Sequence, residues 1–237
     1  MSPATRPGRS GSNASDRVPD QASPFRLQGP GPGLRVLAIG AHSDDIEIGA
    51  GGTILRLISE NLIAEARWIV LSANGEREKE ARAGAAAFLD GVERVEVIVA
   101  NFRDGFFPYL GTAVKDHFED HRESFEPDLI LTHRRDDLHQ DHRLVGELTW
   151  NTYRSHLIIE YEIPKYDLDP ATPNLYVTLT EATCNRKIEL LSETFRTQAS
   201  RPWFDPDAFR AQLRLRGMEC RAESRFAEAF TCQKVVI

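Results

Sequence analysis

The chain has 237 residues, of which 41% are hydrophobic and 27% are charged, and its formal net charge is -7. This length suits one substantial hydrophobic core, so we expect one folded domain. The negative charge argues against a nucleic-acid partner, because phosphate binding needs a basic surface. No apolar run approaches the roughly 18 residues of a membrane span, and the N-terminal segment lacks the apolar stretch of a secretory signal. The three cysteines are widely spaced, which suits a cytoplasmic protein and excludes a CxxC zinc cluster.

The first part of the chain differs in composition from the rest. Residues 1–33 are rich in Ser, Pro, Gly and Arg and contain few apolar side chains. Such a segment cannot bury enough surface to offset its loss of conformational entropy on folding. We therefore predict a flexible N-terminal tail over residues 1–33, followed by a single domain over residues 34–237. The tail is either a dispensable extension or an arm that binds a partner.

Apolar, strand-like runs alternate with helical patterns along the domain. We expect strands at 34–39, 66–72, 94–100 and 128–132, and helices at 48–61, 76–89, 114–125 and 142–156. This alternation predicts an α/β fold with a mostly parallel sheet flanked by helices. For the less regular remainder we expect a loop or edge element at 158–173, a last strand at 174–179, helices at 181–198 and 203–215, and a short final element at 226–236.

Three glycines, Gly49, Gly51 and Gly52, lie in the helix expected after the first strand. They suggest a phosphate-binding loop, but the GxGxxG spacing is absent. The interpretation that we favour is that these glycines permit close packing of the helix against the sheet.

Two short segments, Gly40–Asp45 and His139–His142, each place a histidine and a carboxylate close together after a strand-like run. In open parallel sheets, functional sites lie beyond the carboxyl ends of the strands. We therefore expect both segments to meet at one edge of the sheet. Each alone has an ordinary explanation, since Asp44 and Asp45 suit a helix N-terminus and the histidines suit a surface. Their combination favours a functional site.

The residue types indicate a metal-dependent hydrolase. Two histidines and one carboxylate, here His42, His142 and Asp45, are the usual ligands of a catalytic zinc that keeps one position open for water. The same donors suit Fe²⁺ or Co²⁺. Such a metal lowers the pKa of its bound water from about 15.7 to about 7, so hydroxide is available at neutral pH.

The neighbours of these residues carry the other groups that hydrolysis needs. Asp44 can hold the water and accept its proton as general base. If its turn is helical, His139 shares a face with His142 and can polarise the substrate carbonyl and stabilise the oxyanion. Asp141 is placed to hydrogen-bond an imidazole and fix its tautomer.

The two motifs resemble the signature of the PIG-L/LmbE-like zinc N-deacetylases. The resemblance rests on Ala41–Asp45 with Gly49–Thr53 and on His139–His142, with lesser marks at Asn74–Arg77, Asp104–Gly105 and Pro127–Ile130. It covers residues 34–150 well and the remainder loosely. It implies the Rossmann-like α/β fold of LmbE-like deacetylases and removal of the acetyl group from an N-acetylated amino sugar or its conjugate. It also implies a homo-oligomer, because family members assemble into trimers or hexamers.

The resemblance also implies roles for individual residues. Carried over by position, these are zinc ligands at His42, Asp45 and His142, a general base at Asp44, a carbonyl-polarising or amine-protonating group at His139, and a carboxylate that tunes a histidine at Asp141. Arg77 and Asp104 match positions that face substrate, although Arg77 also suits a solvated helix face. The chain departs from the family at Ser43, where proline is usual. It also lacks a tyrosine that some members carry shortly before the second motif, so the group that assists the leaving amine stays open.

Three further features concern the substrate. His133 ends the fourth expected strand and either lines the pocket or is structural. Arg134 and Arg135 either contact an anionic group of the substrate or pair with the two aspartates that follow them. The aromatic and charged segment 160–166 suits a lid over the site.

Two alternative functions remain open from the sequence. The first is a zinc amidase that acts on a non-sugar N-acyl conjugate. The second is a non-catalytic module that binds a sugar or a nucleotide. The presence of both Asp44 and His139 counts against the second alternative, because binding alone needs neither residue.

Overall fold

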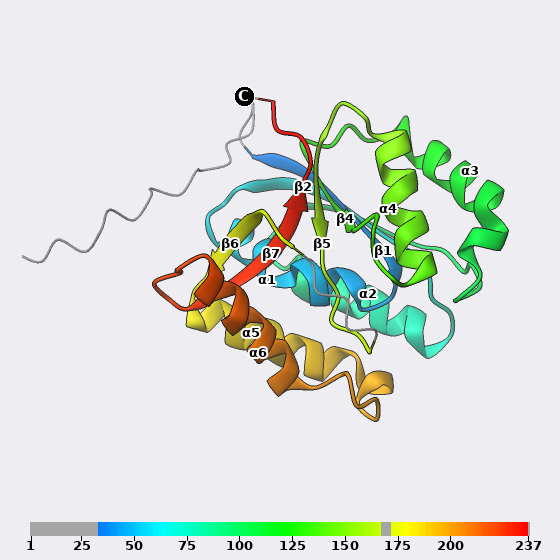
Figure 1. Ribbon diagram of the computed structural model, residues 1–237. Helices are drawn as coiled ribbons and strands as arrows, with labels where there is room; N and C mark the ends of the chain where they lie inside the picture. The colour runs from blue at the N-terminus through cyan, green and yellow to red at the C-terminus, as the bar shows by residue number, and fades with distance from the viewer. Residues whose placement is uncertain (1–32, 167–171, 237) are drawn as a thin grey trace, which may run out of the picture.

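The computed structural model describes residues 33–166 and 172–236 (Figure 1). The predicted tail lies outside the described residues, except for Gly33. The strands are β1 (Leu34–His42), β2 (Ile63–Ser72), β3 (Arg94–Val99), β4 (Leu129–His133), β5 (Leu157–Tyr161), β6 (Leu175–Leu179) and β7 (Phe226–Cys232). The helices are α1 (Asp45–Ser59), α2 (Glu76–Phe88), α3 (Gly111–Arg122), α4 (Gln140–Thr152), α5 (Glu181–Thr194) and α6 (Pro206–Glu219), with short 3₁₀ turns η1 (Phe107–Leu110) and η2 (Arg196–Gln198).

One sheet of seven strands forms the centre of the molecule, in the order β3-β2-β1-β4-β5-β7-β6. The first five of these strands are parallel, and they include the four that the sequence predicted, β1 to β4. Strand β7 runs antiparallel to both β5 and β6. The prediction of a loop or edge element from residue 158 was wrong, because β5 lies inside the sheet between β4 and β7. Ile158 and Ile159 are buried in this strand, and the first proline of the segment, Pro164, comes only after the strand has ended.

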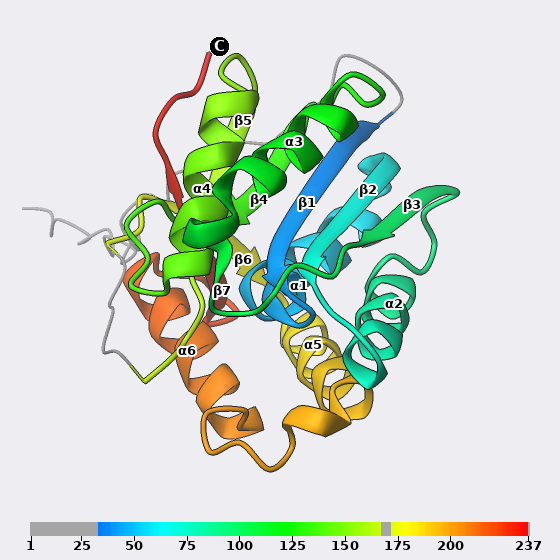
Figure 2. The same ribbon diagram turned by 90° about the vertical axis from the view of Figure 1, so that its right-hand side faces the viewer.

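Alternate residues of the central strands contribute to two separate cores. In β1, Val36 and Ala38 belong to one core, and Leu37 and Ile39 belong to the other. Helices α1, α2, α5 and α6 cover the first face of the sheet, and α3 and α4 cover the second (Figures 1 and 2). Burial on both faces explains why β1 is a continuous apolar run in the sequence. No helix in the described ranges is long and apolar enough to span a membrane.

Local capping signals set the boundaries of the later helices. Thr180 accepts the Thr183 N–H at the start of α5, and Asp205 accepts the Asp207 N–H at the start of α6. Pro206 then occupies the first turn of α6, a position where its missing N–H costs nothing. The helix predicted from residue 203 therefore begins three residues later. The helix predicted to reach residue 198 ends at residue 194 and is followed by η2.

The glycines of α1 bring this helix unusually close to its neighbours. A Cβ atom at Gly49 would collide with the ring of Tyr161, and one at Gly51 would collide with the ring of Phe88. A Cβ at Gly52 would collide with Leu179. These contacts confirm the packing interpretation of the three glycines.

A buried ion pair holds the middle of α1. Lys187 of α5 lies 2.6 Å from Glu228 of β7, and both side chains are almost completely buried. Glu228 accepts the N–H groups of Gly52 and Thr53, at 2.7 and 2.6 Å, and Lys187 donates to the Ile48 carbonyl oxygen at 2.6 Å. Every charge of the pair therefore has polar partners, which is the condition for stable burial of an ion pair. The pair anchors α1 to α5 and β7.

The sheet order creates a crevice at the carboxyl ends of β1 and β4. These strands are neighbours in space, but the chain completes β2 and β3 on one side before it crosses to β4 on the other. The helices that follow them, α1 and α4, lie on opposite faces of the sheet (Figure 2). Such switch points are where ligands bind in open α/β sheets. Both histidine and aspartate motifs lie at this crevice, as predicted.

We expect that Gly49→Ala lowers the free energy of unfolding by about 1–3 kcal/mol, because the added methyl group overpacks α1 against Tyr161. Gly111→Ala is the matched control, since nothing lies within 4 Å of a Cβ atom there. This control is expected to shift stability by about 1 kcal/mol or less, towards greater stability. Urea unfolding of the three proteins checks both values. Equal stability of Gly49→Ala and the parent protein would show that α1 can move away from the sheet.

Candidate active site

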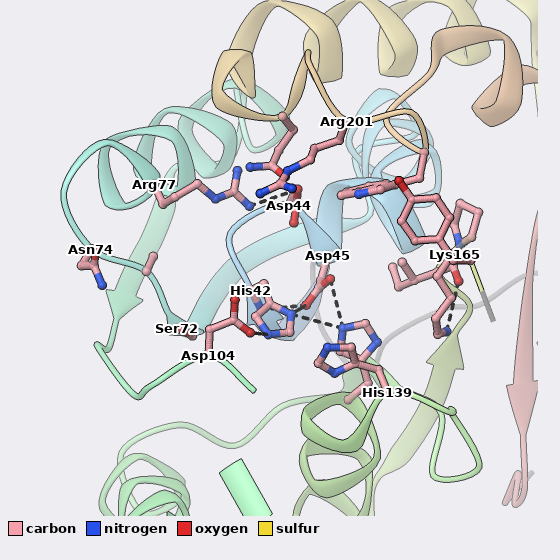
Figure 3. Close-up of a pocket in the computed structure, with 17 residues that line it drawn as sticks. His42, Asp44, Asp45, Ser72, Asn74, Arg77, Asp104, His139, Lys165 and Arg201 are labelled. Atoms are coloured by element: carbon pink, nitrogen blue, oxygen red, sulfur yellow. Dashed lines mark hydrogen bonds and ion pairs between the residues drawn. The ribbon is translucent and has the colours of Figure 1, made fainter. Parts of the chain in front are cut away.

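A cavity of about 530 Å³ opens at the carboxyl end of the sheet (Figure 3). Its volume is within the range of small-molecule sites, about 300–1,000 Å³. It is lined from the ends of β1 and β2, the loop after β3, the start of α4, the segment after β5, and the connection between α5 and α6. Seven of the predicted site residues line it, namely His42, Asp44, Asp45, Arg77, Asp104, His139 and His142.

Two histidine nitrogens and the Asp45 carboxylate converge at the base of this cavity. His42 Nδ1 lies 3.2 Å from His142 Nε2 and 3.3 Å from Asp45 Oδ2. His142 Nε2 lies 3.5 Å from Asp45 Oδ1. A tetrahedral metal with bonds of about 2.0–2.2 Å holds its ligand atoms about 3.3–3.6 Å apart. The three printed separations are close to these values, and each histidine nitrogen lies beside a different oxygen of the Asp45 carboxylate.

The second ring nitrogen of each of these histidines faces a carboxylate. His42 Nε2 lies 3.1 Å from Asp104 Oδ1 and 3.4 Å from Asp141 Oδ2. His142 Nδ1 lies 3.3 Å from Asp137 Oδ2. A carboxylate behind the imidazole is typical of metal-binding histidines, because it fixes the tautomer and the ring orientation. Both rings thus have one nitrogen towards the shared centre and the other towards a carboxylate.

The protonation of His142 also suits a metal ligand. Burial, together with the adjacent ring of His133, lowers the pKa of His142 to about 3. Its imidazole is therefore neutral near pH 7, and a neutral imidazole is the form that binds a metal.

Other groups of potential donors overlap the trio. Within the described ranges they are Asp45 with His133 and His142, His42 with His139 and His142, and His42 with Asp104 and Asp141. In the first group, His133 Nε2 already accepts the Ala41 N–H at 3.0 Å. In the second, His139 Nδ1 already accepts the Asp141 N–H at 3.2 Å. In the third, Asp141 already accepts two backbone N–H groups. In the predicted trio, Asp45 Oδ2 likewise accepts a backbone N–H, that of His42 at 2.6 Å.

Asp137 is a site residue that the sequence analysis did not assign. It is fully buried, and its carboxylate accepts the His139 N–H at 2.7 Å and the Lys165 ammonium at 2.8 Å in addition to facing His142. Burial alone would raise the pKa of Asp137, but His142 and Lys165 hold it well below the usual range. In the sequence, only its position just before the second motif could have indicated that Asp137 belongs to the site.

Of the two roles that the sequence allowed for His133, its position favours the structural one. His133 is fully buried and does not line the cavity. Its ring stacks on that of His142 at a centroid distance of 3.9 Å and also contacts Tyr161. The last residue of β4 therefore faces the interior between the strands, where it supports the His142 ring. This is the structural alternative that the sequence left open.

Asp141 lies beneath the cavity and does not line it. It is fully buried and accepts the N–H groups of Gly105 and Phe107, at 2.6 and 3.0 Å. It therefore fixes the loop after β3, the loop that also carries Asp104, while its carboxylate stands behind His42. This arrangement has the geometry of a carboxylate that orients a histidine.

His139 directs one ring nitrogen to the backbone and leaves the other for a ligand. It is the N-cap of α4, where Nδ1 accepts the Asp141 N–H, so the neutral ring carries its proton on Nε2. Burial and the neighbouring His42 lower the pKa of His139, which keeps the ring neutral near pH 7. The residue lines the cavity beside His142 (Figure 3). Its Nε2–H is therefore a donor suited to an oxygen of a bound ligand.

Asp44 and Asp45 are adjacent, but their carboxyls have different partners and their pKa values are shifted in opposite directions. Asp44 precedes the first turn of α1 but makes no side-chain capping bond, so the ordinary N-cap explanation does not apply to it. Its Oδ2 instead lies 3.0 Å from Arg77 Nη2. Burial raises the pKa of Asp44, and Arg77 opposes this rise. Burial also acts on Asp45, but the surrounding histidines hold the pKa of Asp45 well below its usual range.

Arg77 is part of a network and is not a solvated charge of the α2 surface. Its guanidinium lies between Asp44 and Glu80, with an Nη1–Oε2 distance of 2.9 Å to Glu80. Glu80 in turn accepts the Thr197 N–H at 2.8 Å and the Thr197 hydroxyl at 2.6 Å. This network links Asp44 to η2 in the connection between α5 and α6.

The remaining predictions for the substrate region had mixed outcomes. Arg134 pairs with Asp136 at 2.9 Å, and Arg135 pairs with Glu160 at 3.0 Å and packs on the Trp150 ring. Neither arginine lines the cavity, so neither provides the anion contact considered above. Of the segment predicted as a lid, residues 163–166 line the cavity, whereas residues 160–162 are buried.

Solved structures show the same fold. The N,N'-diacetylchitobiose deacetylase from Pyrococcus horikoshii matches with a TM-score of 0.66 and 22% identity, covering 88% of this chain and 87% of that one. A conserved protein from Thermus thermophilus matches with a TM-score of 0.68 and 21% identity, covering 86% and 96%. The 4-carboxy-2-hydroxymuconate hydratase from Pseudomonas putida matches with a TM-score of 0.60 and 16% identity, covering 86% and 97%. Since a deacetylase and a hydratase share this fold, the fold alone does not decide the reaction.

A sequence comparison matches one segment of the chain to a protein family. Residues 37–153 match the profile of PIG-L, described as GlcNAc-PI de-N-acetylase. The matched segment contains both histidine and aspartate motifs and Asp137. The chain therefore carries a PIG-L family domain over residues 37–153.

Proposed function

We propose that this protein is a zinc-dependent N-deacetylase that hydrolyses the acetamide of an N-acetylated amino sugar or amino-sugar conjugate, releasing acetate and the free amine. The observation that carries the proposal is the convergence of His42 Nδ1, His142 Nε2 and the Asp45 carboxylate within 3.5 Å of one another, at the base of the cavity that Asp44 and His139 also line. The family match supports the reaction type.

In this proposal His42, His142 and Asp45 hold the metal. When bound, a zinc ion supplies a water acidified to near neutral pH and an electrophile for the acetamide carbonyl. The same nitrogen and oxygen donors also suit Fe²⁺ or Co²⁺. Asp104, Asp141 and Asp137 act behind the two histidines and keep their ring nitrogens directed at the centre.

The other residues move protons and stabilise charge. Asp44 accepts the proton of the attacking water, and the raised pKa that burial gives its carboxyl favours this uptake. Arg77 fixes the orientation of the Asp44 carboxylate through their ion pair. His139 donates Nε2–H to the carbonyl oxygen as negative charge develops there. The proton taken up by Asp44 is then available to the departing amine.

The substrate class rests on the cavity and on a structural relative. The cavity of about 530 Å³ is open and rimmed by polar and aromatic side chains, which suits a sugar. The Pyrococcus deacetylase that shares the fold is named for an acetylated disaccharide. Acetate release from a panel of N-acetylated sugars tests the proposal, and N-acetyl amino acids serve as the non-sugar comparison. Turnover confined to the amino acids would replace the sugar substrate with a non-sugar conjugate.

Substitutions at the centre should separate metal binding from proton transfer. We expect His42→Ala and His142→Ala to lose both the metal and turnover. Asp44→Asn should keep about one metal ion per chain but lose turnover by a factor of about 10² to 10⁴, because a general base contributes that much. Elemental analysis beside acetate release measures both properties. Equal metal loss in the Asp44 and His142 variants would remove Asp44 from the role of base.

His139 should be needed for turnover and not for metal binding. His139→Asn retains a side-chain oxygen that can cap α4 but cannot place a donor where Nε2–H lies. We expect a fall in kcat of about 10² to 10³, in line with loss of one oxyanion donor, with metal content and KM changed little. Steady-state kinetics on the metal-loaded variant gives the answer. A variant that no longer retains metal would instead identify His139 as a ligand.

A further inference from the structure

Within the described part of the chain, the charged groups that line the cavity are paired with one another or with buried neighbours, with one exception. Asp45 and Asp104 face histidines, Asp44 faces Arg77, and Lys165 donates to the buried Asp137. Arg201 also lines the cavity, and its side chain is exposed. Among residues 33–166 and 172–236, its guanidinium takes part in no hydrogen bond and no ion pair. Arg201 is therefore a cation that these residues leave available to a ligand.

The segment that carries Arg201 is held in place at both ends. It lies between Phe195 and Phe204, whose side chains are buried and whose rings pack edge to face at a centroid distance of 6.4 Å. Between them, both the N–H and the hydroxyl of Thr197 bind the Glu80 carboxylate. Backbone hydrogen bonds from Arg201 to Gln198 and from Phe204 to Arg201 close two tight turns. Arg201 is therefore presented from a fixed backbone.

The neighbours of Arg201 suit the remote part of a sugar ligand. Trp203 lines the cavity while it packs on the core and against Phe204, so its indole is a fixed flat surface. Gln198 lines the cavity and uses its amide N–H on Thr197, which leaves its carbonyl oxygen as an acceptor. In Figure 3, Arg201 extends from the α5–α6 connection and His139 from α4, with Asp44 and Asp45 between them. A ligand whose acetamide lies at His139 can thus extend towards Arg201.

We propose that the substrate carries an anionic group, a phosphate ester or a carboxylate, and that the Arg201 guanidinium binds this group while the acetamide lies at the metal centre. This inference rests on the proposed function. A guanidinium presents a planar set of donors that matches both anions. A neutral sugar at this end of the cavity could offer hydroxyl acceptors to Arg201 but no negative charge, so an anionic group stabilises the guanidinium more strongly.

The test compares neutral and anionic substrates on the metal-loaded full chain. Acetate release is measured with N-acetylglucosamine, its 1-phosphate, its 6-phosphate and N-acetylmuramic acid, which carries a carboxylate. We expect kcat/KM to be at least about tenfold higher for one of the anionic sugars than for the neutral one, since a hydrogen-bonded charge contributes that much. The preferred sugar identifies phosphate or carboxylate as the anion.

Two variants assign the preference to one side chain. Arg201→Gln is expected to reduce the ratio of the two kcat/KM values to about one. Arg196→Gln is the matched control, because Arg196 is an exposed arginine of the same connection that binds the Glu193 carbonyl oxygen and does not line the cavity. The control should keep the full preference. An anion preference that is absent in the parent protein, or that survives in Arg201→Gln, overturns the proposal.

Binding measurements keep the test independent of turnover. If the metal-loaded protein hydrolyses none of the four sugars, the proposed reaction fails, and calorimetric titration with the same sugars still tests the subsite. Tighter binding of an anionic sugar that is lost in Arg201→Gln and kept in Arg196→Gln supports the subsite. Equal affinities for neutral and anionic sugars in the parent protein overturn it.

Discussion

The parallel pairing of β1 with β4 is the constraint on which the site depends. Val36, Leu37 and Ala38 pair with Leu129, Ile130 and Leu131, and this register brings the carboxyl ends of the two strands together. His42 and His142, which are one hundred residues apart in the sequence, thereby come within 3.2 Å through their ring nitrogens. A slip of the register by one residue would turn the alternate side chains of β4 to the opposite face of the sheet. It would also withdraw His133 from the ring of His142, so the pairing of apolar strands fixes the geometry of the polar centre.

The charged partners of two adjacent buried carboxyls then shift their pKa values apart. Asp44 and Asp45 are adjacent and both are buried, yet the pKa of Asp44 is raised and that of Asp45 is well below its usual range. The difference arises from their partners, because one arginine faces Asp44 whereas His142, His133 and His42 surround Asp45. Groups whose environments separate their pKa values in this way serve as base and as permanent anion in many hydrolases. The same division suits a water-activating carboxylate beside a carboxylate that binds a cation.

Much of this arrangement could be predicted from the sequence, because its determinants are local. Apolar runs that alternate with helical patterns indicated the parallel strands. Because the two motifs follow such strands, their meeting at one edge of the sheet could be inferred. The roles of His133 and Asp137 could not, since they depend on long-range contacts with Ala41, His142 and Lys165. The short strand β5 was also missed, because its apolar run covers only residues 157–159 and is followed by charged residues, aromatics and prolines.

The reacting groups and the surrounding rim come from different parts of the chain. The family match ends at residue 153, and every residue to which we assign a catalytic or metal-binding role precedes that point. The rim is completed by residues 163–166 and by Gln198, Arg201 and Trp203. The last three residues belong to the fixed connection between α5 and α6, which the Glu80 carboxylate joins to Arg77 and hence to Asp44. A chain that changed this connection could alter which substrate is bound while it kept the chemistry of β1, α1 and α4 intact. The fold is shared with both a chitobiose deacetylase and a hydratase, so the paired strands supply the crevice and the side chains placed in it decide the reaction.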